Sequence, residues 1–364
     1  MTDLSALFAP MTFAHGPAMK NRLMLAPLTN LQSHADGTMS EDEFHWLVKR
    51  AEGGFGLTMT CAAHVQRIGQ GFPGQMGIWS DDHLPGLTRL AAAIKANDSI
   101  AIVQLHHAGM RSPTELIGEA PVCPSDNVEF GARALSGEEV EQLRDDFISA
   151  AVRAKTAGFD GIEIHGAHGY VLCQFLSPGV NQRTDQWGGP LENRTRIIRE
   201  ILAAVRQQCG PDFIVGVRLS PERFDLQLPE IRRFAGELML HHEIDFLDMS
   251  LWDVGKPPAD AEYQERSLLD WFTDLPRGEC RLGVAGKIMD PAYAAEILSR
   301  GVDYVLLGRA AILHHDWPRR AQAEPGFKPV SLPVTRDYLE KEGLGPAFRD
   351  YMAGWKGFVA EDAA

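Results

Sequence analysis

The chain has 364 residues, and its 35 Lys and Arg against 49 Asp and Glu give a formal net charge of −14. An acidic chain repels the phosphate backbone, so we expect no general nucleic-acid binding. No apolar run approaches the roughly 20 residues of a membrane span, and the first residues lack a signal-peptide pattern. The five cysteines are scattered and odd in number. These features predict a cytoplasmic globular protein without membrane attachment.

Short apolar segments alternate with longer amphipathic segments along most of the chain. The short segments show little polar alternation, which is typical of strands buried on both faces. They cover residues 22–27, 56–61, 99–105, 159–164, 213–219, 244–250, 281–286 and 302–308. Eight strands that alternate with helices predict an α/β fold of the (β/α)8 TIM-barrel type, and a doubly wound open sheet is the alternative.

The predicted helices carry start signals. Ser40 with Glu43, and Ser136 with Glu139, have the spacing of a capping box, in which each side chain bonds the other residue's backbone. Clear examples of the helices between strands cover residues 40–54, 136–158 and 290–301.

No repeat or interdomain linker is visible, so we expect a single domain over residues 1–364, with the barrel at about 20–325. A short extension at about 326–364 is expected to lie at its periphery. Two long, polar, proline-containing stretches follow the third and sixth strands, at residues 108–135 and 252–266. We interpret them as long loops over the barrel mouth.

Barrel enzymes place their chemistry at the carboxyl ends of the strands. The unusual polar residues of the chain fall at or just beyond those ends. In chain order the candidates are Pro27, Thr29, Ala62, Gln104, His107, His165, His168, Tyr170, Arg218, Ser250, Gly286, Gly308 and Arg309. We therefore expect them to meet at one end of the barrel.

The residues after the last two strands suggest a phosphate site. In barrels, a phosphate often binds at the loops after the seventh and eighth strands. Gly286 and Gly308 would let the backbone approach, and Arg309 would add a charge-assisted hydrogen bond. The alternative is that these residues are ordinary turn and helix-start signals.

Two other strand-end residues have structural alternatives of their own. Arg218 ends an apolar strand, so it needs an anionic or electron-rich partner, either a ligand or one of the carboxylates Glu163 and Asp248. Gln104 taken alone is a structural hydrogen-bonding residue as readily as a ligand contact.

His165, His168 and Tyr170 follow the fourth strand closely. The two histidines are three residues apart, so they can face one site from a single turn. They could bind a metal, although no Glu completes an H-E-x-x-H motif, or they could bond the loop backbone. A third interpretation has two imidazole N–H groups holding one substrate oxygen, with Tyr170 as a proton donor beside them.

Several stretches resemble the Old Yellow Enzyme family of flavin mononucleotide (FMN) dependent oxidoreductases. They are "NRLMLAPLTN", "GIWSDDH", "VQLHHAG", "GFDGIEIHGAHGYVLCQFLSPGVNQRTDQWGGPLENR" and "YVLLGRA". The resemblance implies a barrel that holds noncovalent FMN at its mouth. It also implies that NADH or NADPH reduces the flavin, and that an electron-poor alkene then takes the place of the nicotinamide.

The resemblance also implies roles for the residues after the fourth strand. His165 and His168 resemble the pair that grips the activating oxygen of an α,β-unsaturated carbonyl or nitro compound. Hydride would pass from flavin N5 to the β-carbon, and Tyr170 resembles the donor that protonates the α-carbon. The implied activity is that of an NAD(P)H-dependent ene-reductase.

Other candidates resemble residues that hold FMN in the family. Thr29 would bond the flavin C4 oxygen, Gln104 the pyrimidine edge, and Arg218 the region of N1 and O2. The flavin ring would lie against Pro27 and Ala62, and the phosphate would be held by Gly286, Gly308 and Arg309.

Some features depart from the family pattern. One branch has Cys at position 29 and Tyr at position 31, where this chain has Thr29 and Leu31. The tail does not match the arginine-bearing tail that some relatives insert into a neighbouring subunit, although we expect a homodimer or a larger homo-oligomer. Which of His106 and His107 faces the flavin is left open.

Three other functions stay open. One is a catabolic flavin reductase with a narrower substrate, such as an unsaturated acid or thioester. The others are a metal-dependent barrel hydrolase and a flavin-binding protein without catalysis.

Overall fold

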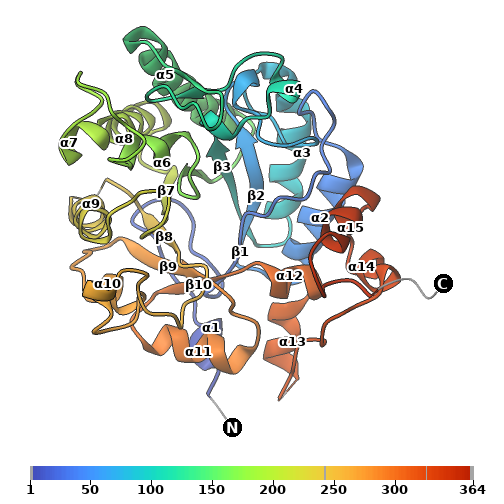
Figure 1. Cartoon of the computed structure of the whole chain (residues 1–364). Coiled ribbons are helices and arrows are strands. Elements are labelled where there is room, and N and C mark those ends of the chain that lie inside the picture. Colours follow the sequence, from blue (N-terminus) through green and yellow to red (C-terminus); the bar gives the residue numbers. More distant parts are fainter. Residues whose placement is uncertain (1–2, 242, 325, 361–364) are drawn as a thin grey trace.

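The computed structural model describes residues 3–360 except 242 and 325. Eight parallel strands close into a barrel in the order β1-β10-β9-β8-β7-β6-β3-β2 (Figure 1). They are β1 (Leu23–Leu25), β2 (Leu57–His64), β3 (Ile100–His106), β6 (Gly161–Gly166), β7 (Ile214–Leu219), β8 (Phe246–Ser250), β9 (Arg281–Ala285) and β10 (Tyr304–Leu307). The predicted barrel is confirmed, and each strand overlaps its predicted segment, although β2 and β6 run past their predicted ends to His64 and Gly166, so that His165 lies inside β6.

Helices surround the barrel and connect its strands (Figure 1). The longer ones are α2 (Glu41–Glu52), α3 (Leu84–Lys95), α5 (Gly137–Thr156), α8 (Arg196–Cys209), α9 (Leu228–Leu240) and α11 (Pro291–Ser299). The shorter ones are α1 (Ser5–Phe8), α4 (Thr114–Ile117), α6 (Val171–Leu176), α7 (Leu191–Arg194), α10 (Asp270–Thr273), α12 (Arg309–Leu313), α13 (Trp317–Ala323), α14 (Arg336–Lys341) and α15 (Pro346–Ala353). Within the described part of the chain, no helix combines the length and the apolar character that crossing a membrane requires.

The two predicted capping boxes behave differently. Ser136 and Glu139 form one at the start of α5. Ser40 caps α2 through the backbone N–H of Glu43, but the Glu43 carboxylate accepts a hydrogen bond from Asn30 instead of returning to Ser40. The second half of that capping box was therefore predicted wrongly, because a buried amide competes for the carboxylate.

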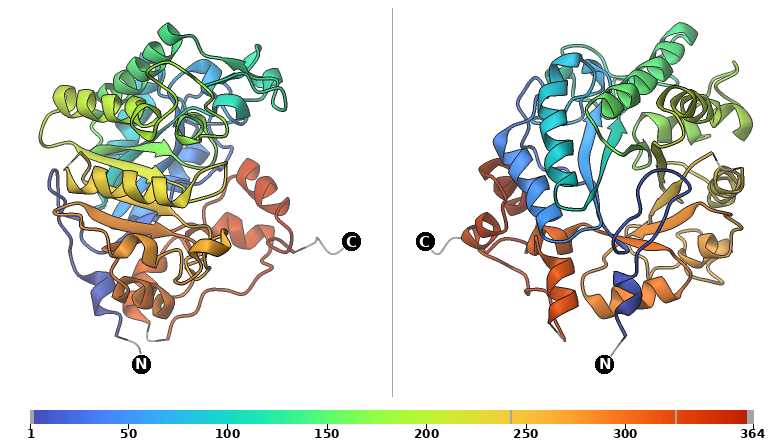
Figure 2. Two further views of the ribbon diagram at one scale, coloured as in Figure 1. Left: turned by 60° about the vertical axis from the view of Figure 1, so that its left-hand side comes forward. Right: turned by 180° about the vertical axis from the view of Figure 1, so that it is seen from behind.

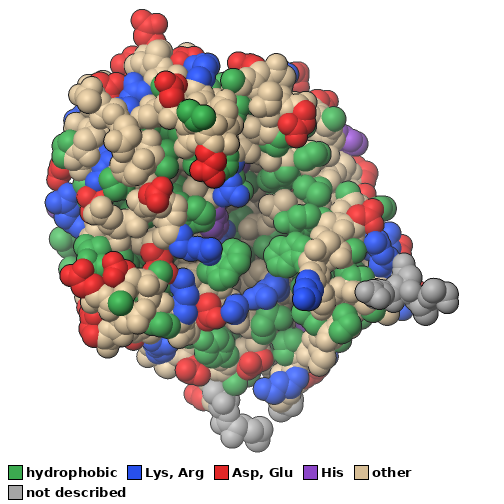
Figure 3. All heavy atoms as spheres, in the orientation of Figure 1, with side chains coloured by type: hydrophobic (Ala, Val, Ile, Leu, Met, Phe, Trp, Pro, Cys, Tyr) green, Lys and Arg blue, Asp and Glu red, His purple; other side chains and the backbone are tan. Residues whose placement is uncertain are grey.

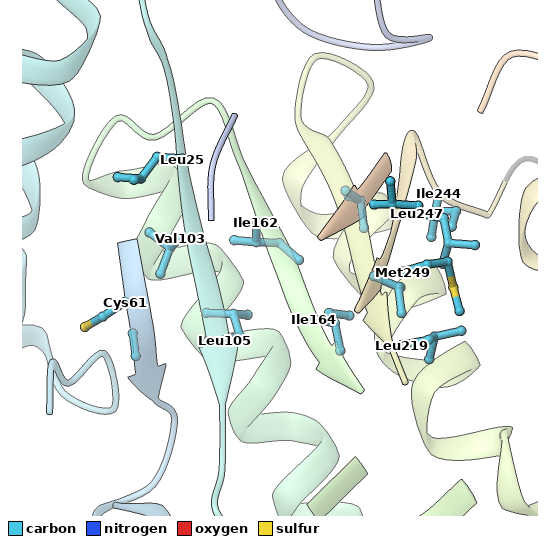
Figure 4. Packing of buried hydrophobic residues seen from close by; sticks show 14 of the residues in the cluster. Leu25, Cys61, Val103, Leu105, Ile162, Ile164, Leu219, Ile244, Leu247 and Met249 are labelled. Carbon is cyan, nitrogen blue, oxygen red and sulfur yellow. The ribbon is translucent and has the colours of Figure 1, made fainter. Parts of the chain in front are cut away.

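Two apolar cores hold the barrel together. The larger lies between the strands and the surrounding helices, and Figure 4 shows Val103, Ile162 and Leu247 among its members. The smaller fills the amino-terminal half of the barrel interior with Met24, Met59, Ile102, Phe246 and Tyr304. An N-terminal loop crosses that end of the barrel (Figure 2), with Met11 bridged to Met19. The carboxyl ends of the strands are thus the open end.

The long connections lie at that open end. Residues 108–135 contain a 3-10 turn, α4 and a small pair of strands, β4 (Val122–Cys123) and β5 (Arg133–Ala134). A single 3-10 turn (Ala261–Tyr263) lies within residues 252–266.

The C-terminal extension contributes more than its predicted peripheral position suggests. Its helix α15 packs on α2, with the rings of Phe348 and Trp46 edge to face at 4.8 Å. From there Tyr351, Met352 and Trp355 reach the barrel mouth. The predicted extension ends in residues 361–364, which lie outside the described part of the chain.

Candidate active site

A cavity of about 450 Å³ opens at the carboxyl ends of the strands. Figure 3 shows the hollow at the centre of this face, with basic side chains around it. Its lining includes the predicted residues Pro27, Thr29, Ala62, Gln104, His165, His168, Tyr170, Arg218 and Arg309. Gly286, Gly308 and Arg309 line an adjoining cavity of about 220 Å³. The structure therefore brings all the predicted site residues to one end of the barrel.

Polar side chains form the floor of the cavity. Side chains alternate between the inside and the outside of the barrel along each strand, so every second residue faces inward. Gln104, Glu163, Arg218 and Asp248 all occupy inward-facing positions, above the apolar half of the interior. Gln104 Nε2 donates to Glu163 Oε1 at 2.6 Å. Its amide oxygen remains available to accept a hydrogen bond from a ligand.

Arg218 forms a buried ion pair at the same level. Its Nε lies 2.9 Å from Asp248 Oδ2, at an angle too bent for a hydrogen bond. Burial raises the pKa of Asp248, and Arg218 opposes that rise. Burial, and then the Asp248 charge, raise the pKa of Glu163. Arg218 thus has the predicted structural partner, and it also lines the cavity.

A β-bulge lies beside this floor. The pairing of β2 with β3 shifts between Met59 and Ala62, so that Ala62 pairs with Gln104. The Thr60 hydroxyl accepts a hydrogen bond from the Gln104 backbone N–H at 3.2 Å. Bulges are common beside active sites, where they redirect a strand. Ala62, at the end of this shift, lines the cavity.

The two histidines converge within the cavity. His165 Nε2 and His168 Nδ1 lie 3.0 Å apart. A tight turn produces this approach, since His168 and Gly169 have φ angles of 60° and 71°. Burial is the main cause that lowers the pKa of both imidazoles well below the usual value, so both are neutral near pH 7. Each ring therefore carries one N–H.

Hydrogen bonds constrain where those protons lie. The Ala167 backbone N–H donates to His165 Nδ1 at 3.4 Å, which leaves the His165 proton on Nε2. His168 Nε2 lies 2.7 Å from Ser250 Oγ, and Arg218 Nη2 donates to the same oxygen at 3.4 Å. Ser250 thus links the His168 ring to the Arg218 guanidinium.

Tyr170 lies next to the two histidines. Its ring packs edge-on against His106 and His165, with centroids 4.3 Å and 5.1 Å away. Burial raises the pKa of the phenol, so Tyr170 keeps its proton near neutral pH. A protonated hydroxyl facing the cavity is a ready proton donor.

The sequence left open which of His106 and His107 faces the predicted flavin site. Neither of them lines the cavity. His106 supports the Tyr170 ring from behind, and its Nδ1 lies 3.0 Å from Gln75 Nε2. His107 accepts a hydrogen bond from the Gly109 backbone N–H. Burial lowers the pKa of both rings, to about 3 for His107.

The adjoining cavity suits a phosphate group. Gly286 lies against the loop after β8, since a Cβ atom at this position would lie 2.9 Å from the Asp253 backbone nitrogen. Arg309 forms no ion pair with a carboxylate among the described residues. Its guanidinium is thus free for an anion. The larger cavity, with its polar floor, then lies where the ring of a phosphorylated cofactor would extend.

Sequence reasoning missed several lining residues. They are Leu28, Phe72, Arg111, Arg223, Phe224, Ile312, Tyr351, Met352 and Trp355, whereas Trp252 belongs to the stretch 252–266 that was predicted to lie over the mouth. Arg111 would have been the easiest of these to predict from the sequence, because it comes two residues after the matched stretch "VQLHHAG". The tail residues carry no local signal, since only tertiary packing brings α15 to the mouth.

Fold and site together define a (β/α)8-barrel protein with a cavity at the carboxyl ends of its strands that suits a phosphorylated cofactor. The model of the NADH:flavin oxidoreductase / NADH oxidase family matches residues 6–325. The chain belongs to this family. It is therefore an oxidoreductase with FMN as its cofactor and NADH or NADPH as its reductant, and the predicted Old Yellow Enzyme relationship is confirmed.

Individual relatives agree with this assignment. The probable NADH-dependent flavin oxidoreductase YqiG of Bacillus subtilis (strain 168) is 38% identical over 322 residues, covering 85% of this chain and 86% of that protein. The NADH:fumarate oxidoreductase of Klebsiella pneumoniae (strain 342) is 36% identical over 89% of this chain, which matches only 36% of that protein. The solved structure of an Old Yellow Enzyme homologue from Zymomonas mobilis has a TM-score of 0.78 at 27% identity, covering 95% of this chain and 99% of that one.

Proposed function

We propose that the enzyme reduces the C=C bond of α,β-unsaturated carbonyl or nitro compounds. The observation that carries this proposal is the convergence of His165 Nε2, His168 Nδ1 and the Tyr170 phenol in one cavity. Two neutral N–H donors suit an oxygen that gains negative charge, and a neutral phenol suits protonation of carbon. A protein that only stored FMN would not need this set.

The residues present fit FMN. Gln104 and Arg218 would hold the pyrimidine edge of the ring, and Thr29 the C4 oxygen. The ring would lie against Pro27 and Ala62, and the phosphate would be held by Gly286, Gly308 and Arg309. When bound, FMN supplies the two-electron chemistry that links the nicotinamide to the alkene.

Ser250 would complete the donor pair. Its oxygen accepts from Arg218, so its own hydrogen is free to point at His168 Nε2. That arrangement moves the His168 proton to Nδ1, beside the Nε2–H of His165. A substrate oxygen that accepts from both N–H groups then replaces the contact between the two rings.

Tyr170 would supply the second hydrogen of the product as a proton. Its O–H bond breaks as a new C–H bond forms at the α-carbon, and the phenolate is reprotonated from solvent. A phenol with a raised pKa gives up its proton only to a strongly basic centre, such as the enolate carbon of the reduced substrate. The high pKa of the Tyr170 phenol therefore suits protonation of the α-carbon after hydride has reached the β-carbon.

A narrower substrate range is the second candidate, namely reduction of an unsaturated acid. The name of the NADH:fumarate oxidoreductase supports a relationship to such substrates, and the arginines at the mouth of this chain favour it. A cytoplasmic location and a homo-oligomeric state stay predictions from the sequence.

The test follows the colour of the flavin in two steps under anaerobic conditions. NADH or NADPH should bleach the yellow holoenzyme, and an enone such as cyclohexenone should restore the colour and appear as its saturated product. Bleaching without restoration by any enone or nitroalkene would contradict the proposal while leaving the flavin assignment intact.

A further inference from the structure

The cavity holds an unusual set of charges for a chain with a net charge of −14. Four arginines line it, Arg111, Arg218, Arg223 and Arg309, and among residues 3–360, apart from 242 and 325, no aspartate or glutamate lines it. Arg218 pairs with Asp248 below the floor. The other three form no ion pair with a carboxylate in the described part of the chain. Figure 3 shows the basic side chains around the hollow.

These arginines divide between the two cavities. Arg218 and Arg309 line both, which places them at the cofactor's ring and phosphate. Arg111 and Arg223 line the larger cavity but not the adjoining one. They therefore lie on the side of the histidines and Tyr170, where the substrate is expected, and the cofactor does not account for them.

Arg111 is held directly beside the proposed proton donor. Its Nη1 donates to the His168 backbone oxygen at 2.6 Å, and its guanidinium carbon lies 5.1 Å from the centre of the Tyr170 ring. A guanidinium has five N–H donors in a planar fork. Anchoring one nitrogen leaves the remainder oriented for an anion close to Tyr170.

Arg223 is presented by a strained loop after β7. Arg223, Phe224 and Asp225 have φ angles of 68°, 53° and 56°, so three consecutive non-glycine residues are left-handed. Such backbone strain persists where the surrounding structure enforces it, and it concentrates at functional sites. The loop directs Arg223 to the mouth, where its guanidinium carbon lies 5.4 Å from the centre of the Trp252 ring.

We propose that Arg111 and Arg223 form a carboxylate-binding subsite, so that the preferred substrates are electron-poor alkenes that carry a carboxylate besides the activating carbonyl. This inference rests on the proposed ene-reduction and adds its substrate class. Guanidinium groups bind carboxylates through paired, charge-assisted hydrogen bonds. Since Arg111 contacts Tyr170, a substrate carboxylate bound to Arg111 would be only a few bonds, within the substrate, from the α-carbon that Tyr170 protonates.

A phosphate of the nicotinamide cosubstrate is the other anion that could bind here. In a dinucleotide the phosphates are separated from the reacting ring by a ribose, whereas Arg111 touches the proton donor itself. Its position thus favours a group on the substrate.

The experiment compares 4-oxopent-2-enoate with its amide, two enones that differ by one charge. Binding to the oxidised holoenzyme is measured by calorimetry, and turnover is measured separately with NADH. We expect the acid to bind at least about tenfold more tightly than the amide, the size of one charge-assisted hydrogen bond. That preference should fall in Arg111→Gln and vanish in Arg111→Gln/Arg223→Gln, while Arg111→Lys keeps part of it.

Arg89→Gln is the matched control, because Arg89 pairs with Glu41 on the surface and does not line the cavity. Equal affinities for acid and amide, or a preference that survives in the double variant, would overturn the subsite. So would a double variant that slows flavin reduction by NADH or NADPH without changing the preference, since the anion would then be a nucleotide phosphate.

Calorimetry measures binding without turnover, so it distinguishes a failure of the carboxylate-binding subsite from a failure of the proposed ene-reduction. If the double variant abolishes a clear preference for the acid, the subsite stands even when neither compound restores the flavin colour. If both compounds are reduced equally well by every variant, ene-reduction stands and the subsite fails.

Discussion

His165 Nε2 lies 3.0 Å from His168 Nδ1, and both imidazoles are neutral near pH 7 because burial lowers their pKa. The left-handed backbone of His168 makes this approach possible two residues after β6 ends at Gly166. A neutral pair can donate to a substrate oxygen without a permanent charge, so it favours the state in which that oxygen becomes negative.

Removing one member of the pair tests its role. In His165→Ala, we expect the affinity of the oxidised holoenzyme for an enone to fall about tenfold or more, the cost of one lost hydrogen bond to a polarised oxygen. A calorimetric titration measures the affinity. His34→Ala, at an exposed histidine, is the control. Unchanged affinity in His165→Ala would remove the histidines from substrate binding.

Ser250 should act through His168. In Ser250→Ala nothing fixes His168 Nε2, so the ring can keep its proton on the wrong nitrogen. We expect kcat/KM for an enone to fall about tenfold, with flavin reduction by NADH spared. Ser250→Thr keeps the hydroxyl and should recover part of the loss, which a purely steric role of Ser250 would not allow. Ser299→Ala, at an exposed helix end, is the control.

Asp248 should tune the flavin through Arg218. Removing its charge in Asp248→Asn leaves the Arg218 cation uncompensated beside the cofactor site. Since reduced flavin gains negative charge, we expect the midpoint potential to rise by tens of millivolts, where about 30 mV corresponds to 1.4 kcal/mol for a two-electron couple. Equilibration with a reference dye measures it. Asp245→Asn breaks an ion pair at the opposite end of the barrel and should leave the potential unchanged.

The buried histidines should make the protein sensitive to acid. Burial lowers the pKa of His64 to about 4 and of His107 to about 3, and it also lowers that of His106, His165 and His168. An unfolded chain binds these protons near pH 6.5, so stability is lost as pH falls below that value.

The buried carboxyls Glu43, Glu163 and Asp248 have raised pKa values and act in the opposite direction, but the histidines outnumber them. We therefore expect a lower urea midpoint at pH 5.5 than at pH 7.5. In His107→Asn the difference between the two pH values should shrink. A midpoint that rises on acidification would show that the carboxyls dominate.

Much of the site could be predicted because strand ends follow from local sequence. Apolar runs locate the strands, and the barrel then gathers their ends, so His165, Arg218 and Arg309 could be placed together without coordinates. The direction of Glu163 and Asp248 could not be predicted, because a shift of one residue reverses the face of a strand. Arg223 and Trp355 depend on a strained loop and on long-range packing, which leave no periodic signal.

Tyr170→Phe tests the central claim most directly, with the two half-reactions followed separately by anaerobic stopped flow. Flavin reduction by NADH should be largely unchanged, while reoxidation by an enone should slow by about 10²–10⁴-fold, the range of a lost general acid. Tyr293→Phe, at a tyrosine that does not line the cavity, should alter neither rate. An equal loss in both half-reactions, or no loss in reoxidation, would show that Tyr170 is not the proton donor to the alkene.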